Sequence, residues 1–200
     1  MIFSEFDDAN ISKILDQVAP DWSPPDADMD FKRFYAEYTV RHNIWDASYS
    51  LQASDDQGNF LAACFAAPKD AQEDLEKADK WLLEKTDGGK NLSEEKKFSF
   101  SLSKKYLSMM DNKCSNLMTD DDIKLVLFVS CHKGAGYPLL EKFKKMLKAQ
   151  GYKNIYLWTD SDCNWDWYNR RGYELLEQEI YQPFSREDEP YYYYIFRQSL

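Results

Sequence analysis

The apolar residues in the first third of the chain follow two different periodicities. Ile11, Ile14, Leu15 and Val18 recur at helical spacing, which predicts a helix with one apolar face. The turn sequence at 55–59 lies between two apolar runs and therefore predicts a β-hairpin. The predicted elements are a strand over Met1–Phe6, helices over Asn10–Val18 and Phe31–Val40, and strands over Ser48–Ala53 and Phe60–Ala67.

The middle of the chain changes to Lys, Glu, Asp and Leu with helical periodicity. Gly88-Gly89 divides this segment, and a further helix is predicted over Phe98–Met110. The pattern predicts a helical insertion over residues 70–117, ahead of the most apolar strand. One of its helices would carry an apolar stripe of Leu75, Ala78, Trp81 and Leu82.

The last third begins with a near-continuous apolar run, which is typical of a central strand buried on both faces. A loop over 130–136, a helix and a further strand follow, so the unit predicts two parallel strands joined by a crossover. Gly151 stands where a glycine ends a helix. The predicted elements are a strand over Ile123–Val129, helices over Pro138–Gln150 and Cys163–Arg171, and strands over Asn154–Thr159, Tyr173–Tyr181 and Tyr191–Arg197.

The composition narrows the class of protein. The chain has 200 residues, which suits one domain, and its formal net charge of -10 disfavours nucleic-acid binding. The four cysteines have no CxxC spacing and there are two histidines, so no metal site is expected and a reducing cytoplasm is favoured. A signal peptide and a membrane-spanning run are not visible in the sequence.

The loop between the apolar strand and its helix is the clearest candidate for chemistry. Gly134 and Gly136 allow the backbone to approach an anion, and the N–H groups at the start of a helix bind phosphate. Lys133 adds a positive charge. The P-loop pattern is absent. A dinucleotide-binding unit would place a third glycine where Leu139 stands, although Asp160 lies at a plausible distance for its acid; that alternative and an ordinary tight turn stay open.

Two segments together resemble the GCN5-related N-acetyltransferase (GNAT) family. The loop Lys133-Gly134-Ala135-Gly136-Tyr137-Pro138 is similar to the family pattern Gln/Arg-x-x-Gly-x-Gly/Ala, with Lys133 for the usual Arg or Gln and Pro138 for the small residue. The stretch 157–173 resembles the strand, short helix and Tyr-x-x-x-Gly-Phe/Tyr signature, here Tyr168 to Tyr173. The resemblance covers 123–176 directly.

The resemblance implies an α/β (α+β) fold in one domain over 1–200, with a strongly twisted, mostly antiparallel mixed sheet flanked by helices. The strands from Ile123 and Asn154 would run parallel and splay apart, and the core over 123–176 would bind acetyl-coenzyme A. The implied contacts come from the strand end, the glycine loop and the short helix. They are Phe128, Val129, Ser130, Lys133, Gly134, Ala135, Gly136, Tyr137, Leu139 and Asn164.

The implied reaction is acetyl transfer from acetyl-CoA to a primary amine by direct attack in a ternary complex, without a metal. Asn164 and Tyr168 are four residues apart, so we expect them on one helical face, where the Tyr168 hydroxyl can protonate the leaving thiolate. The alternative for Tyr168 is a core aromatic. The general base is not evident, and Glu37, His42 and Asp46 are its candidates.

The sequence leaves several alternatives for function. A non-catalytic acyl-CoA-binding or interaction module could share this fold. For the enzyme, the acceptor is a small-molecule or peptide amine, with no nucleic acid or membrane partner expected, and a homodimer stays open. The insertion over 70–117 is longer than the family's usual connection, so it is either a lid or a helical decoration.

Overall fold

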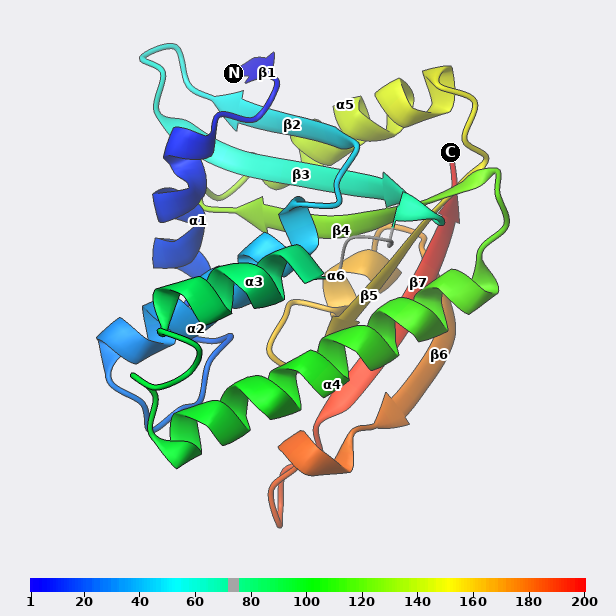
Figure 1. Ribbon diagram of the computed structural model, residues 1–200. Coiled ribbons are helices and arrows are strands. Elements are labelled where there is room, and N and C mark those ends of the chain that lie inside the picture. The colour runs from blue at the N-terminus through cyan, green and yellow to red at the C-terminus, as the bar shows by residue number, and fades with distance from the viewer. Residues whose placement is uncertain (72–75) are drawn as a thin grey trace.

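A single twisted sheet forms the centre of the molecule (Figure 1). The computed structural model describes residues 1–71 and 76–200. The strand order is β1-β2-β3-β4-β5-β7-β6, and all neighbouring pairs are antiparallel except β4 with β5. The predicted mixed, mostly antiparallel sheet is confirmed. The alternative of a dinucleotide-binding unit, which would have a parallel sheet, is wrong. The strands are β1 (Ile2–Ser4), β2 (Tyr49–Ser54), β3 (Phe60–Pro68), β4 (Asp122–Ser130), β5 (Asn154–Asp160), β6 (Glu174–Ile180) and β7 (Tyr192–Ser199).

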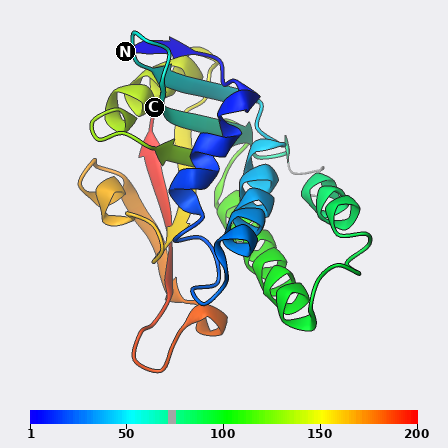
Figure 2. The same cartoon turned by 90° about the vertical axis from the view of Figure 1, so that its left-hand side faces the viewer.

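Helices cover both faces of the sheet. Figures 1 and 2 show α5 on one side and α2, α3 and α4 on the other. The α5 side packs its apolar stripe on β3, β4 and β5, whereas α1 and α2 pack on the opposite face of β3 and β4. The helices are α1 (Ile11–Val18), α2 (Met29–Ile44), α3 (Glu76–Lys85), α4 (Glu94–Leu117), α5 (Gly136–Ala149) and α6 (Asp166–Asn169), with short 3-10 turns η1 (Asp8–Asn10) and η3 (Gln182–Phe184).

The helix starts follow capping residues rather than the first apolar residue. The Asp28 carboxylate accepts from Phe31 N, so α2 begins at Met29, ahead of the predicted Phe31. Ser93 caps α4 in the same way, and the helix runs well beyond both predicted ends, Phe98 and Met110. At the other end of α5, Gly151 has φ +98° and ends the helix as predicted.

The long helix α4 belongs to the core. Its residues Tyr106, Met110 and Cys114 are buried against Tyr156 of β5 and Ile195 of β7. The shorter α3 adds Ala78 and Leu82, with Trp81, to a cluster shared with α2 and α4. The predicted apolar stripe is confirmed at these positions, and its first member, Leu75, lies outside the described residues. The insertion thus supplies a layer over the β5–β7 part of the sheet.

The parallel strands β4 and β5 pair briefly and then separate. Their register pairs Asp122 with Asn154, Ile123 with Ile155 and Lys124 with Tyr156, and it ends there. Directly afterwards β4 contains a bulge. Two consecutive residues of β3, Phe65 and Ala66, pair with Leu127 and Leu125, so β4 has one extra residue between the two pairs. A bulge bends a strand and increases its twist, so it turns the second half of β4 away from β5. The predicted splay is confirmed.

Candidate active site

A cavity of about 980 Å³ opens where β4 and β5 separate. The strands contribute residues 125–128 and 157–160 to its wall, and α2 and α4 cover it from one side of the sheet. Tyr168 of α6 reaches the same cavity from the α5 side, where its ring packs with the cluster that holds α5. The cavity therefore joins the two faces of the sheet through the splay, and its remaining walls come from the α1–α2 loop and the β6–β7 loop.

The Tyr168 side chain combines a packed ring with a place in the cavity wall. Its ring lies 5.3 Å from the Tyr173 ring and 5.7 Å from the Phe196 ring, centroid to centroid. Burial raises the pKa of Tyr168 well above its ordinary value, so the hydroxyl is protonated at neutral pH. A neutral hydroxyl at this position is chemically able to donate a proton into the cavity.

The expected helical pairing of Asn164 with Tyr168 is wrong. The helix α6 covers only 166–169, so Asn164 precedes it and is exposed to solvent. The local chain makes tight turns instead, in which Trp167 N donates to Asn164 O. Asn164 remains a predicted cofactor contact, but a shared helical face is not the reason.

The glycine loop prepares the start of α5 for an anion. Gly134 has φ +91° and open space where a Cβ would be, and the Lys133 side chain beside it is exposed. Within the described part of the chain, the N–H groups of Gly136 and Tyr137 have no acceptor, as expected for the first turn of a helix. Positive φ is thus confirmed at Gly134. Free donors and a positive helix end make this position suitable for phosphate.

Gly136 has a different role from the one its position in the motif suggests. A Cβ at this residue would lie 2.9 Å from Phe128 Cζ and 3.1 Å from Ser130 Cβ. A side chain at this residue would therefore require Phe128 and Ser130 to shift, and glycine allows α5 to lie this close to the end of β4. Gly136 positions the loop by packing, and a side chain added here would meet the strand before it met a ligand.

Several predicted contact residues can reach a ligand only through their backbone. Ala135, Val129 and Leu139 have buried side chains in the core. Leu139 N already donates to Ala135 O, so it has no free donor. Phe128 lines the cavity, and Tyr137 is exposed beneath the Arg171 guanidinium. From Leu125 onward β4 pairs with β3 on one edge and has no paired strand on the other among the described residues, which leaves the backbone from Phe128 to Ser130 open along the splay.

Sequence reasoning missed the acidic end of the cavity. Asp160, at the end of β5, accepts a hydrogen bond from Tyr106 of α4 at 3.1 Å. Asp162 accepts one from Tyr191 of the β6–β7 loop at 3.0 Å. Both carboxylates line the cavity. The sequence signal was the Asp-Ser-Asp run after an apolar strand, in which Asp160 was weighed only as the acid of a dinucleotide site.

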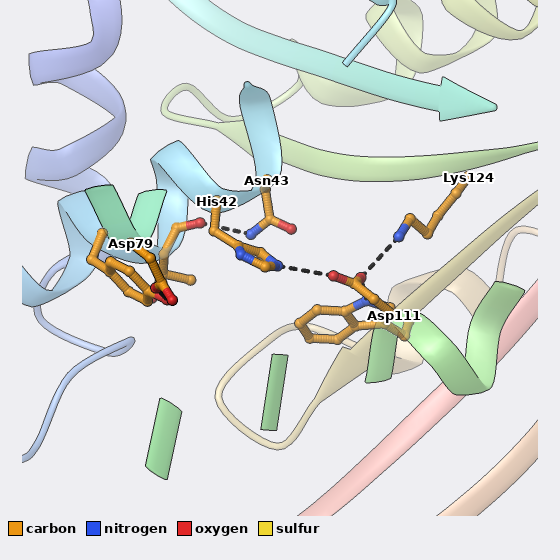
Figure 3. Close-up of polar contacts among 8 residues, drawn as sticks. His42, Asn43, Asp79, Asp111 and Lys124 are labelled. Carbon is orange, nitrogen blue, oxygen red and sulfur yellow. Dashed lines mark hydrogen bonds and ion pairs between the residues drawn. The ribbon is translucent and has the colours of Figure 1, made fainter. Parts of the chain in front are cut away.

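A second buried polar cluster lies beside the cavity (Figure 3). Asp111 of α4 accepts from Lys124 Nζ at 2.8 Å and from Trp158 Nε1 at 2.9 Å, and its other oxygen lies 2.9 Å from His42 Nε2. The cluster joins α2, α4, β4 and β5. A lysine within the apolar run of β4 was the signal in the sequence, because a buried lysine requires a partner.

The three candidate general bases lie away from the cavity wall. Glu37 pairs with Arg41 on α2, and Asp46 lies 4.0 Å from Lys77 Nζ. His42 belongs to the cluster around Asp111. None of the three is among the described residues that line the cavity. The region that the structure describes also contains no cluster of His, Cys, Asp and Glu suited to a metal ion. Across residues 1–71 and 76–200, no helix has the length and apolarity to cross a membrane.

Comparisons with known proteins identify the fold. No family model matches the chain, and no curated protein sequence matches it. Solved structures do: the ribosomal-protein-S18-alanine N-acetyltransferase of Escherichia coli is similar over 99% of this chain and 92% of its own, with a TM-score of 0.54 and 10% identity. An agmatine N-acetyltransferase is similar over 100% of this chain and 99% of its own, with a TM-score of 0.55 and 14% identity. A GNAT-family acetyltransferase of Staphylococcus aureus Mu50 is similar over 100% of this chain and 98% of its own, with a TM-score of 0.50 and 12% identity. The chain therefore has the fold of the GCN5-related N-acetyltransferases.

Proposed function

We propose that this protein is an N-acetyltransferase that moves the acetyl group of acetyl-CoA to a primary amine within a ternary complex. The observation that carries the proposal is the cavity at the splay, with Tyr168 in its wall. A passage through the sheet lets a thioester approach from the α5 side and an amine from the α2 and α4 side. The fold agrees with this assignment, since similar structures are N-acetyltransferases of a ribosomal-protein alanine and of agmatine.

The residues present fit coenzyme A. The free N–H groups of Gly136 and Tyr137 and the charge of Lys133 would hold the pyrophosphate. The unpaired edge of β4 from Phe128 to Ser130 would bind the pantetheine amides as an added strand does. We expect Gly134 to matter for the loop conformation, Ala135 and Val129 to act through packing and backbone, and Leu139 to act through packing. Asn164 would contribute from the turn before α6.

The proposed reaction requires few chemical groups from the protein itself. Acetyl-CoA supplies an acetyl group activated as a thioester; the acceptor nitrogen forms the new C–N bond as the C–S bond breaks. The Tyr168 hydroxyl donates its proton to the departing sulfur, the acceptor nitrogen loses one proton to solvent, and the Tyr168 oxygen regains one from solvent. The cavity walls hold the nitrogen close to the carbonyl carbon, which supplies rate by proximity. We place the reaction in the cytoplasm, because the four cysteines are free thiols.

Turnover of acetyl-CoA with a panel of amines tests the proposal. Thiol release should depend on the added amine, and mass spectrometry should find the acetylated product. A Tyr168→Phe variant, which keeps the ring, is the matched control for background release. If calorimetry shows binding of coenzyme A while no amine in the panel supports thiol release, the protein is a non-catalytic acyl-CoA-binding module and the proposal is wrong.

A further inference from the structure

One end of the cavity is both acidic and aromatic. We define the acidic pocket as Asp160, Asp162, Tyr106, Phe184 and Tyr191, all of which line the cavity. They come from the end of β5, from α4 and from the chain around the β6–β7 loop. Backbone geometry holds the carboxylates together, because Asp162 N donates to Asp160 Oδ1 at 3.2 Å. The pocket is therefore assembled from three separate elements that meet at this end of the splay.

The negative charge of the acidic pocket has no counterion. Asp160 is 8% exposed, yet neither Asp160 nor Asp162 forms an ion pair with any described residue. The charge of Arg186 lowers the pKa of Asp162, but Arg186 lies 3.9 Å from Glu189 and is itself exposed. Burial, and then the charge of Asp160, raises the pKa of Asp162 to about 6. Because buried charges are normally paired, an acid at the wall of a cavity without a cation is an arrangement suited to a cationic ligand.

Aromatic rings that pack against one another line the same end of the cavity. The Tyr106 ring lies 5.0 Å from the Phe184 ring and 6.1 Å from the Tyr191 ring, and Phe184 lies 5.2 Å from Tyr191. Ring faces attract alkylammonium and guanidinium groups and exclude water from them. This second feature is independent of the carboxylates and favours the same class of ligand, an organic cation rather than a metal ion.

The acidic pocket lies within reach of the reaction centre without being part of it. Cys163 N donates to Asp160 O at 3.1 Å in the turn that leads from β5 to α6, and Cys163, Tyr168 and both carboxylates line the same cavity. An acceptor whose nitrogen is beside Tyr168 would thus extend a short aliphatic chain toward Asp160 and Asp162. Of the charged residues that line the whole cavity, the acids are Asp21, Asp26, Asp160, Asp162 and Glu189, and the bases are Lys32 and Arg186.

We propose that the acidic pocket selects the acceptor: a primary aliphatic amine that carries a second cationic group, which the carboxylates of Asp160 and Asp162 bind while the first nitrogen is acetylated. The inference rests on the proposed acetyl transfer and adds the substrate class to it. Asp160 and Asp162 are specificity-determining residues on this assignment, and Tyr106 and Tyr191 orient their carboxylates.

Three acceptors of matched length test the proposal on the unmodified protein. They are 1,4-diaminobutane, 1-aminobutane and 4-aminobutyrate, which share a four-carbon chain and end in an ammonium, a methyl and a carboxylate group. At saturating acetyl-CoA, kcat/KM for the diamine should exceed that for 1-aminobutane by at least tenfold, which corresponds to about 1.4 kcal/mol. 4-Aminobutyrate should be the poorest acceptor, because the carboxylates of Asp160 and Asp162 would repel its own carboxylate.

A variant series assigns the preference to residues. Asp162→Asn should lower the ratio of kcat/KM for the diamine to that for 1-aminobutane by at least tenfold, and it keeps the shape of the side chain, which favours folding. Asp188→Asn, at an exposed acid of the β6–β7 loop outside the cavity wall, is the matched control and should not change this ratio. Equal use of diamine and monoamine by the unmodified protein, or an unchanged ratio in Asp162→Asn, would overturn the assignment and leave acetyl transfer standing. No thiol release with any amine would overturn both.

Discussion

Lys124 Nζ lies 2.8 Å from Asp111 Oδ1, and each of these side chains is at most 6% exposed. The contact joins the middle of the sheet to α4, the long helix of the insertion. Burial by itself raises the pKa of Asp111, but the charge of Lys124 and the hydrogen bond from His42 outweigh it and hold that pKa well below its usual value. The carboxylate is therefore ionised in the folded protein over the whole neutral range.

Removing this carboxylate should destabilise the protein strongly. Asp111→Asn leaves Lys124 buried without its partner, so we expect a loss of about 3–5 kcal/mol in the free energy of unfolding, measured by urea denaturation. Because the folded pKa of Asp111 lies below the unfolded value of about 3.9, the stabilisation is complete above that pH and is lost as the pH falls below it. The variant should lack this acid-dependent part of the stability. Asp121→Asn, which breaks the exposed pair with Lys153, is the control and should have a much smaller effect. Equal losses in the two variants would contradict a structural role for the buried pair.

Two glycines with the same backbone conformation allow the effect on coenzyme A binding to be distinguished from the stability cost of positive φ. Gly134 has φ +91° and Gly58, in the β2–β3 turn, has φ +83°, and both have open space at the Cβ position. Alanine at either residue should cost about 1–2 kcal/mol in stability, because an L side chain disfavours positive φ. Only Gly134→Ala should weaken coenzyme A binding, by at least about tenfold in calorimetry. Unchanged affinity in a folded Gly134→Ala protein would place the phosphate site elsewhere.

Tyr168→Phe removes one hydroxyl from the cavity wall and keeps the ring packing. If that hydroxyl protonates the thiolate, the single-turnover rate should fall by roughly 10²-fold, while coenzyme A affinity barely changes. Single-turnover kinetics are the appropriate measurement, since they isolate the chemical step.

The neighbouring Tyr173 provides the matched control. Its hydroxyl is buried and has no hydrogen-bond partner among the described residues, although its ring packs beside Tyr168. Tyr173→Phe should therefore leave the rate unchanged and raise stability by about 1 kcal/mol, since it removes an unsatisfied buried group. A wild-type rate in Tyr168→Phe, or an equal loss in both variants, would end the general-acid assignment.

The preference for a diamine should depend on pH. The pKa of Asp162 is raised to about 6, first by burial and then by Asp160; Asp21 raises it further, while Tyr191 and Arg186 lower it. The carboxylate is charged above this pH and neutral below it. The ratio of kcat/KM for 1,4-diaminobutane to that for 1-aminobutane should therefore fall as the pH drops through about 6. A ratio that stays constant from neutral to acidic pH would remove Asp162 from cation recognition.

The sequence by itself determined the local elements and their order. The helices around Ile14 and Phe143 and the hairpin at Gly58 were predictable, because apolar periodicity and turn residues act over a few positions along the chain. The loop from Lys133 to Gly136 was predictable for the same reason, since a strand, two glycines and a helix stand next to each other. The resemblance to the acetyltransferases came from these contiguous motifs, and so did the splay of the two parallel strands.

Only the tertiary structure decided which side chains meet in and beside the cavity. Asp160 meets Tyr106 from 54 positions away, and His42 meets Asp111 from 69 positions away. No local pattern encodes such pairs, because each depends on how α4 crosses β5 and on how the β6–β7 loop folds back. The role of Gly136 was likewise hidden: in the sequence it belongs to a phosphate motif, and in the structure it allows α5 to lie against Phe128. Packing between distant elements brings the residues of this site together, and that packing is a property of the assembled sheet rather than of any one segment.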